Sequence, residues 1–266
     1  MVANFNVHCG MDGWARRFDV VAACAEIDAD VLVLEESWAP DGGQSLASRV
    51  AAELGYELAE AELARARVLD EDPALLGPDG PASWAPRWSR RRVPRALLLE
   101  AATRKRPQAA RATPGRARRP GSWGIAVLWR VPARRVEVLD LRQLRGDLPR
   151  RRAVLLELEC GLTVAGAHLA HLSDGSVRQM RQLAGELARR GGAMVLTGDM
   201  NSWTFPLVAM LPGWRKAVHG RTWPAAMPHS QIDHLLVTGG VEASGGEVLP
   251  PLGSDHRAIR ATVRLR

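Results

Sequence analysis

The sequence predicts an α+β fold in which two β-sheets form the core and helices cover them. Three patterns indicate this fold: strands and helices alternate in the first 55 residues, apolar runs joined by short turns follow residue 124, and residues 256–265 alternate between apolar and polar side chains. Short turns favour antiparallel pairing, and the final alternation is typical of a strand with one buried face. The core should therefore lie between and beneath the sheets.

Each predicted element has a local signal. Residues 15–27 should form a helix, because apolar and small residues recur at helical spacing between 18 and 25. Glycines follow the helices expected at 44–54 and 176–190, as they commonly do at helix ends. The expected strands are residues 2–7, 31–34, 124–130, 134–141, 153–159, 162–168, 193–197, 232–237 and 256–265.

Composition indicates one domain spanning residues 1–266. The chain is 46% hydrophobic and shows no repeat, and its three cysteines form neither a disulfide framework nor a thiolate metal motif. It begins without a signal-peptide pattern and has no apolar run of the roughly 18 residues that a membrane span needs. We expect a cytoplasmic monomer, although an upstream start codon would hide a leader.

Residues 63–122 interrupt the pattern with a basic, proline-rich insertion. The chain has 36 basic and 29 acidic side chains, and residues 70–122 hold 12 of the basic and 5 of the acidic ones. The rest of the chain has 24 of each sign and no net charge, so the whole excess of positive charge lies between residues 70 and 122. Eight prolines there oppose regular structure except for a possible helix at 94–105. Arg90, Arg91 and Arg92 are candidates for holding a polyanion. A solvated loop of arginine-rich composition is the equal alternative.

Short polar motifs follow apolar, strand-like runs along the whole chain. Their carboxylates, amides and imidazoles are the groups that bind a hard divalent cation, orient a phosphate and transfer protons. The motifs are Phe5-Asn6-Val7, Leu34-Glu35-Glu36, Ala167-His168-Leu169, Gly198-Asp199-Met200-Asn201, Ile232-Asp233-His234 and Ser254-Asp255-His256.

In order and spelling, these motifs resemble the endonuclease/exonuclease/phosphatase superfamily, which shares the fold of pancreatic deoxyribonuclease. The resemblance runs from residue 2 to the last strand and fails only at 63–122. It implies a four-layer αββα sandwich of two mainly antiparallel sheets flanked by helices. It also implies hydrolysis of a phosphoester with Mg²⁺ or Mn²⁺.

The resemblance assigns catalytic roles to five residues. Asp199 would position or deprotonate the attacking water, and Asn201 would hold the water or the phosphate. Asp233 would orient His256, which contacts the phosphate or takes the proton, while His168 supports the phosphate or the leaving group. Taken alone, Asp199 and Asn201 would equally suit a turn that binds its own backbone.

The resemblance also implies a metal site. Glu36 matches the metal-binding acid, and Glu35, where relatives usually have glutamine, should face the other way because side chains alternate along a strand. Asn6 and Asp255 complete the site, with Asn6 orienting the acid. Arg152, at the head of a strand, is a candidate phosphate contact.

Two departures narrow the activity. Abasic-site repair members use a catalytic tyrosine, but Tyr56 lies in a segment that does not match, which argues against that function. Secreted deoxyribonucleases place an acid beside the equivalent of His168, and this chain has Ser122 and Trp123 there. His234 is expected to pack rather than react.

The motifs predict recognition of a phosphate group but do not indicate which molecule carries it. Nucleic acid, inositol phosphate and phospholipid all remain candidates, as do endonuclease, exonuclease and monoesterase modes. The basic insertion favours nucleic acid, and Trp14, Trp38 and Trp203 follow motif residues where they could stack on bases. A non-catalytic polyanion-binding protein on the same fold is the alternative from another class, against which the complete motif set argues.

Overall fold

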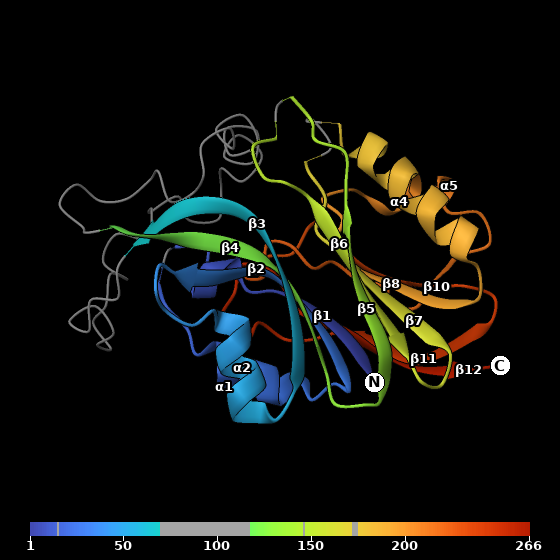
Figure 1. The fold of residues 1–266 in the computed structure, drawn as a ribbon, viewed down its shortest axis with the longest axis horizontal. Coiled ribbons are helices and arrows are strands. Elements are labelled where there is room, and N and C mark those ends of the chain that lie inside the picture. Colours follow the sequence, from blue (N-terminus) through green and yellow to red (C-terminus); the bar gives the residue numbers. More distant parts are fainter. Residues whose placement is uncertain (15, 70–117, 146, 172–174) are drawn as a thin grey trace.

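The computed structural model describes residues 1–14, 16–69, 118–145, 147–171 and 175–266, and its two β-sheets stack face to face between helices (Figure 1). The helices are η1 (His8–Gly10), α1 (Val20–Ile27), α2 (Leu46–Leu54), α4 (Ser176–Arg190) and α5 (Thr204–Ala209). The strands are β1 (Val2–Asn6), β2 (Val31–Pro40), β3 (Glu57–Leu69), β4 (Arg118–Trp129), β5 (Ala133–Asp140), β6 (Arg152–Leu158), β7 (Leu162–Ala167), β8 (Ala193–Asp199), β9 (Arg215–Lys216), β10 (Asp233–Val237), β11 (Val241–Val248) and β12 (Ile259–Leu265).

Each sheet has six strands and is mainly antiparallel. The orders are β11-β12-β1-β2-β4-β3 and β5-β6-β7-β8-β10-β9. Only β1 with β2 and β7 with β8 pair in parallel among these described strands. The predicted four-layer αββα sandwich is therefore confirmed.

Alternation along the strands divides the core into layers. In β2, Leu32 and Leu34 belong to the cluster that packs under α1 and α2, whereas Val31 and Val33 belong to the cluster between the sheets. A third cluster lies beneath α4 on the outer face of the second sheet. The polar residues that end these strands consequently meet at one end of the space between the sheets.

The first long helix begins later than its periodicity predicts. Asp19 caps α1 by accepting a hydrogen bond from the Ala22 amide, so the helix starts at Val20 rather than at residue 15. The preceding chain is irregular, because His8, Cys9 and Gly10 adopt positive φ angles in η1. This part of the chain folds back beside the end of β1, where Asn6 lies.

Strand β3 was not predicted, and it shortens the expected insertion. β3 and β4 pair from Glu57 with Trp129 to Leu69 with Arg118, so residues 63–69 and 118–122 are strand. The two strands extend together to the left of Figure 1. Arg90, Arg91, Arg92 and the expected helix at 94–105 lie outside the described residues. The elements β9, β11 and α5 were also not predicted.

Two β-bulges face the middle of β4. The register shifts in β2 between Glu35 and Ser37 and in β3 between Glu62 and Ala64, both opposite Gly124. A Cβ atom at Gly124 would lie 2.3 Å from the Ala61 carbonyl oxygen, so the backbones approach closely here. The bulge in β2 places Glu36 at φ 54° and changes the direction of the chain at a predicted site residue.

No helix in the described part of the chain is long and apolar enough to cross a membrane.

Gly198 has a steric role in the fold. It adopts φ 147°, and a Cβ atom there would lie 1.9 Å from the Ala167 carbonyl oxygen on β7. We expect Gly198→Ala to destabilise the protein by at least about 3 kcal/mol, which lowers Tm by roughly 6 °C or more. Calorimetry checks this, with Gly185→Ala in α4 as the matched control, because open space surrounds Gly185. An unchanged Tm for Gly198→Ala would contradict the steric account.

Candidate active site

Asp199 lies at the centre of the polar cluster between the sheets. It ends β8, is buried, and its Oδ2 accepts a hydrogen bond from Asn6 Nδ2 at 3.1 Å. The same oxygen lies 3.6 Å from His168 Nε2 and 3.8 Å from His256 Nε2. Asn201, at φ 46°, donates its backbone N–H to Asp199 Oδ1 at 2.9 Å. Four motifs thus converge on one carboxylate.

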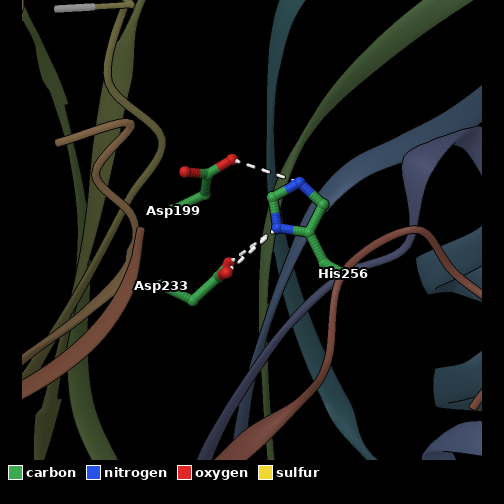
Figure 2. A group of neighbouring side chains, drawn as sticks. All are labelled: Asp199, Asp233 and His256. Atoms are coloured by element: carbon green, nitrogen blue, oxygen red, sulfur yellow. Dashed lines mark hydrogen bonds and ion pairs between the residues drawn. The ribbon is translucent and has the colours of Figure 1, made fainter. Parts of the chain in front are cut away.

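Asp233 and His256 form a hydrogen-bonded pair beside it. His256 Nδ1 lies 3.1 and 3.0 Å from the two Asp233 oxygens, and its Nε2 faces Asp199 (Figure 2). Asp233 starts β10 directly opposite Asp199 on β8. The imidazole therefore bridges two carboxylates, in the arrangement expected for a proton relay.

Burial and charge shift the pKa values of this cluster in a consistent way. Burial opposes protonation of His256, but the charge and hydrogen bond of Asp233 together with the charges of Asp199 and Asp255 outweigh it, and the pKa of His256 is raised well above 6.5. Burial raises the pKa of Asp199 to about 7, against the opposing charge of His256. A carboxyl group with a pKa near neutrality can both accept and release a proton.

Asn6 contacts both Glu36, the predicted metal-binding acid, and Asp199. Its Nδ2 lies 3.4 Å from Glu36 Oε1 and donates to Asp199, while its Oδ1 accepts from the His8 amide at 3.0 Å. Ser254 Oγ donates to the Asn6 carbonyl at 2.6 Å, so both ends of the chain hold this residue. Such contacts suit an amide that orients carboxylates, and this role of Asn6 stays a prediction.

Strand alternation does not separate Glu35 from Glu36 as expected. Glu35 is fully buried and feels the charges of Asp233 and Asp199, and Glu36 also contributes to the electrostatic environment of Asp199. The bulge after Glu35 breaks the alternation that the prediction assumed. Both acids consequently belong to the site, and the sequence pattern missed Glu35 because the bulge depends on the neighbouring strand.

Asp255 has two contacts that sequence reasoning did not find. Trp223 Nε1 donates to its Oδ2 at 3.3 Å, and His8 Nδ1 lies 3.3 Å from its Oδ1. The charges of Asp255 and Glu36 both act on the Cys9 thiol, so the two carboxylates share one neighbourhood. The sequence signal that could have revealed the His8 contact is its position two residues after Asn6, a predicted site residue.

His168 joins the cluster from β7. It is 2% exposed, and its Nε2 lies 3.3 Å from Asn201 Nδ2. Burial, followed by the charge of Arg151, holds the pKa of His168 well below 6.5. The residue therefore remains neutral near pH 7, in contrast to His256.

Other candidates lie outside this cluster. Arg152 pairs with Asp140 at 2.7 Å and donates to the Glu62 carbonyl at 3.0 Å, so these contacts direct its guanidinium to groups outside the acidic cluster. His234 points to the Ser202 carbonyl at 2.9 Å and packs in the interior, as expected. Arg90, Arg91 and Arg92 cannot be placed, since they lie outside the described residues.

The donor set fits a hard divalent cation. Donor atoms of Asp199, Asp233 and His256 lie within 4.8 Å of one another, but His256 Nδ1 is occupied by Asp233. Both Glu35 oxygens are buried without a hydrogen-bond partner in the described structure, beside other acids. Such a group needs a proton or a cation. Glu36 and Asp255 lie near each other, since both charges act on Cys9, and their role as metal ligands stays a prediction.

The buried Glu35 makes stability depend on pH. Burial, then the charges of Asp233 and Asp199, raise its pKa well above 4.5. The stability contributed by its neutral form is complete below the unfolded-state pKa and is lost as pH rises through the folded-state pKa. In EDTA we expect Glu35→Gln to raise Tm at pH 8 by a few degrees, on the order expected for one or two kcal/mol, and less at pH 5. Exposed Glu57→Gln is the control, and an equal effect of both substitutions would contradict this account.

Comparisons with solved structures agree with this fold. An endonuclease/exonuclease/phosphatase from Beutenbergia cavernae is 19% identical with a TM-score of 0.64, covering 99% of this chain and 71% of that chain. The human Nocturnin catalytic domain with bound sulfate is 13% identical with a TM-score of 0.58, and the match covers 100% of this chain and 94% of that chain. The mannosyl-6-phosphatase of Bacteroides thetaiotaomicron is 13% identical with a TM-score of 0.61, covering 99% of each chain.

A comparison with curated protein sequences gives no match. The sequence model of the endonuclease/exonuclease/phosphatase family, whose members are generally phosphoester hydrolases, matches residues 3–256. This chain belongs to the endonuclease/exonuclease/phosphatase family.

Proposed function

We propose that this protein hydrolyses phosphoester bonds with Mg²⁺ or Mn²⁺ and that its substrate is a nucleic acid. The observation that carries the reaction class is the convergence on Asp199 Oδ2 of Asn6 Nδ2, His168 Nε2 and His256 Nε2, at 3.1, 3.6 and 3.8 Å. A carboxylate surrounded by donors, with Asp233 behind one imidazole, suits activation of a water beside a phosphate.

Each residue of the site has a role in this proposal. Asp199 orients the attacking water and accepts its proton, for which a pKa of about 7 is well matched. His256, kept protonated by Asp233, donates to a phosphoryl oxygen. Asn201 and neutral His168 orient the phosphate by hydrogen bonding. The cation, bound through Glu36 and Asp255, would neutralise charge on the phosphoryl oxygens.

Nucleic acid is favoured by charge and by aromatic side chains near the site. The net charge of +7 resides between residues 70 and 122. Trp203 follows Asn201 by two positions and is 62% exposed. Trp14 is 47% exposed and follows Gly13, where an added Cβ atom would lie 3.4 Å from Asp255 Cβ. These indoles are available for base stacking. Trp38 is not, because it is buried under α2.

The test offers several substrates in parallel. Supercoiled plasmid, single-stranded RNA, inositol phosphates and phospholipid vesicles are each incubated with Mg²⁺, Mn²⁺ or EDTA, and Asp199→Asn controls for contaminating enzymes. Metal-dependent cleavage of plasmid or RNA supports the proposal. Turnover of only inositol phosphates or phospholipid would reject the substrate class. Binding of nucleic acid without turnover would favour the non-catalytic alternative.

The basic insertion gives a further prediction. Replacing Arg90, Arg91 and Arg92 with alanine should weaken nucleic-acid binding and flatten its salt dependence by up to about one unit of log-log slope per lost phosphate contact. Fluorescence anisotropy at several salt concentrations measures this. Turnover of a small chromogenic phosphodiester should change little, since it lacks the extended phosphate backbone that these arginines are proposed to hold.

The matched control removes the same charge elsewhere. Arg134, Arg135 and Arg264 are exposed on β5 and β12, and their triple alanine variant should retain the wild-type salt slope. If the two triple variants bind DNA and RNA alike, the nucleic-acid preference fails and a small-molecule or lipid phosphoester becomes the first candidate.

A further inference from the structure

A row of four side chains leads away from the acidic cluster on the His168 side. The Trp123 ring on β4 packs against His168, with centroids 5.7 Å apart and planes at 47°. The Arg151 guanidinium lies 5.6 Å from the centroid of the same indole. Arg151 in turn makes a two-pronged ion pair with Asp147, with Nε to Oδ2 at 2.8 Å and Nη2 to Oδ1 at 3.1 Å.

His168 lacks the contact that usually fixes a catalytic imidazole. Its Nε2 faces Asn201 and Asp199, but its Nδ1 is buried without a hydrogen-bond partner within the described ranges. In most such sites, the second ring nitrogen donates to a carboxylate or a carbonyl, which sets the orientation of the ring. The indole of Trp123, which packs against the imidazole, is a contact that can hold the ring instead.

The ion pair of Arg151 and Asp147 is buried, so its formation carries a desolvation cost. Arg151 and Asp147 are 8% and 7% exposed, and Arg151 Nη1 is buried without a partner. Buried ion pairs recover their desolvation cost only with good geometry, and apolar residues often serve stability as well. What the pair provides is a fixed cation against one face of the indole, which restricts the tilt of the ring.

We propose that Trp123, held by the Arg151–Asp147 pair, is a positioning residue that orients His168 by ring packing in place of a hydrogen bond at Nδ1. Asp147 and Arg151 lie four residues apart in the segment between β5 and β6, whereas Trp123 lies on β4. All three act on the reaction only through His168. The kinetic part of the proposal rests on the proposed hydrolase function, whereas the orientation of the ring is independent of it.

The kinetic test compares two tryptophans on the same strand. Trp123→Leu should lower kcat by about 10–100-fold, the usual range for supporting residues, with a smaller change in KM. Trp123→Phe, which keeps a ring, should recover most of the loss. Trp129→Leu is the matched control, because Trp129 lies on the same face of β4 at its other end and should leave kcat unchanged.

A double-mutant cycle separates positioning from general damage. If Trp123 acts through His168, then Trp123→Leu should cost almost nothing further in a His168→Gln background. The pair is tested with Asp147→Asn combined with Arg151→Met, since a single change would leave a buried charge uncompensated. This double variant should lower kcat by less than Trp123→Leu does.

Nuclear magnetic resonance reads the orientation without turnover. In ¹⁵N-histidine-labelled wild type, His168 should show one defined tautomer, and Trp123→Leu should average or broaden its signals while the Trp129→Leu spectrum matches wild type. Those spectra in a protein that hydrolyses nothing would support positioning and reject the hydrolase. Unchanged His168 signals in Trp123→Leu, or a kcat loss that adds in full to that of His168→Gln, would overturn the inference.

Discussion

Asp199→Asn should lower kcat by about 10²–10⁴-fold, the usual cost of losing a positioned acid or base, without loss of the fold. The carboxylate is the point at which Asn6, His168 and His256 converge, and asparagine has the same shape without the charge. Because burial raises the pKa of Asp199 to about 7, its ionised form destabilises the folded state. Above pH 7, the Tm of Asp199→Asn should therefore equal or exceed the Tm of the wild type, although the variant has lost activity. Initial rates and calorimetry on the same preparation measure both.

His256→Gln should cost a similar factor. Glutamine can still donate to buried Asp233, so this substitution perturbs the fold less than alanine would. The control is His234→Gln, the same change in a buried histidine of the adjacent motif that bonds to Ser202 instead. It should affect Tm more than kcat. Near wild-type turnover in either Asp199→Asn or His256→Gln, with unchanged circular dichroism, would show that the catalytic assignment is wrong.

Local pattern predicted much of the fold and the geometry at the strand ends. Asp199 follows an apolar strand that is correctly placed within two residues, and Asp233 begins another that pairs beside it. Period-two patterns and strand ends are properties of the nearby sequence, so they can be found without tertiary information. The same local patterns were sufficient to predict a core of two sheets covered by helices.

The errors arise where distant parts of the chain determine local structure. β3 is rich in alanine, glutamate, leucine and arginine, which favour helices, and it becomes a strand because it pairs with β4 along nearly its whole length. Glu36 leaves the expected alternation because β2 bulges opposite Gly124. The contact between Trp123 and His168 joins two sheets and has no spacing in the sequence that could reveal it.

Glu36→Gln should raise the Mg²⁺ or Mn²⁺ concentration needed for half-maximal activity on the order of 10–100-fold, the range commonly lost when a metal site is disturbed. Glu36 is partly exposed beside the buried cluster, and its Oε1 makes a long contact with Asn6 at 3.4 Å, so the carboxylate is available to a cation. Carboxylate oxygen is the preferred ligand of these ions. Titration of activity with metal measures the shift, and Mn²⁺ binding followed by electron paramagnetic resonance measures it without turnover.

Glu35→Gln is the matched comparison, because the same substitution is made one residue away. Burial and the neighbouring acids raise the pKa of Glu35 well above 4.5. The amide therefore replaces a carboxyl group whose ionised form is disfavoured, and the metal requirement should shift less. Because the bulge brings both acids to the site, the direction of the side chains does not distinguish their roles. A different effect of the two substitutions on the metal requirement must come from the charge and the solvent exposure of each acid. Equal shifts for the two variants, or full activity in EDTA, would remove Glu36 from the metal site.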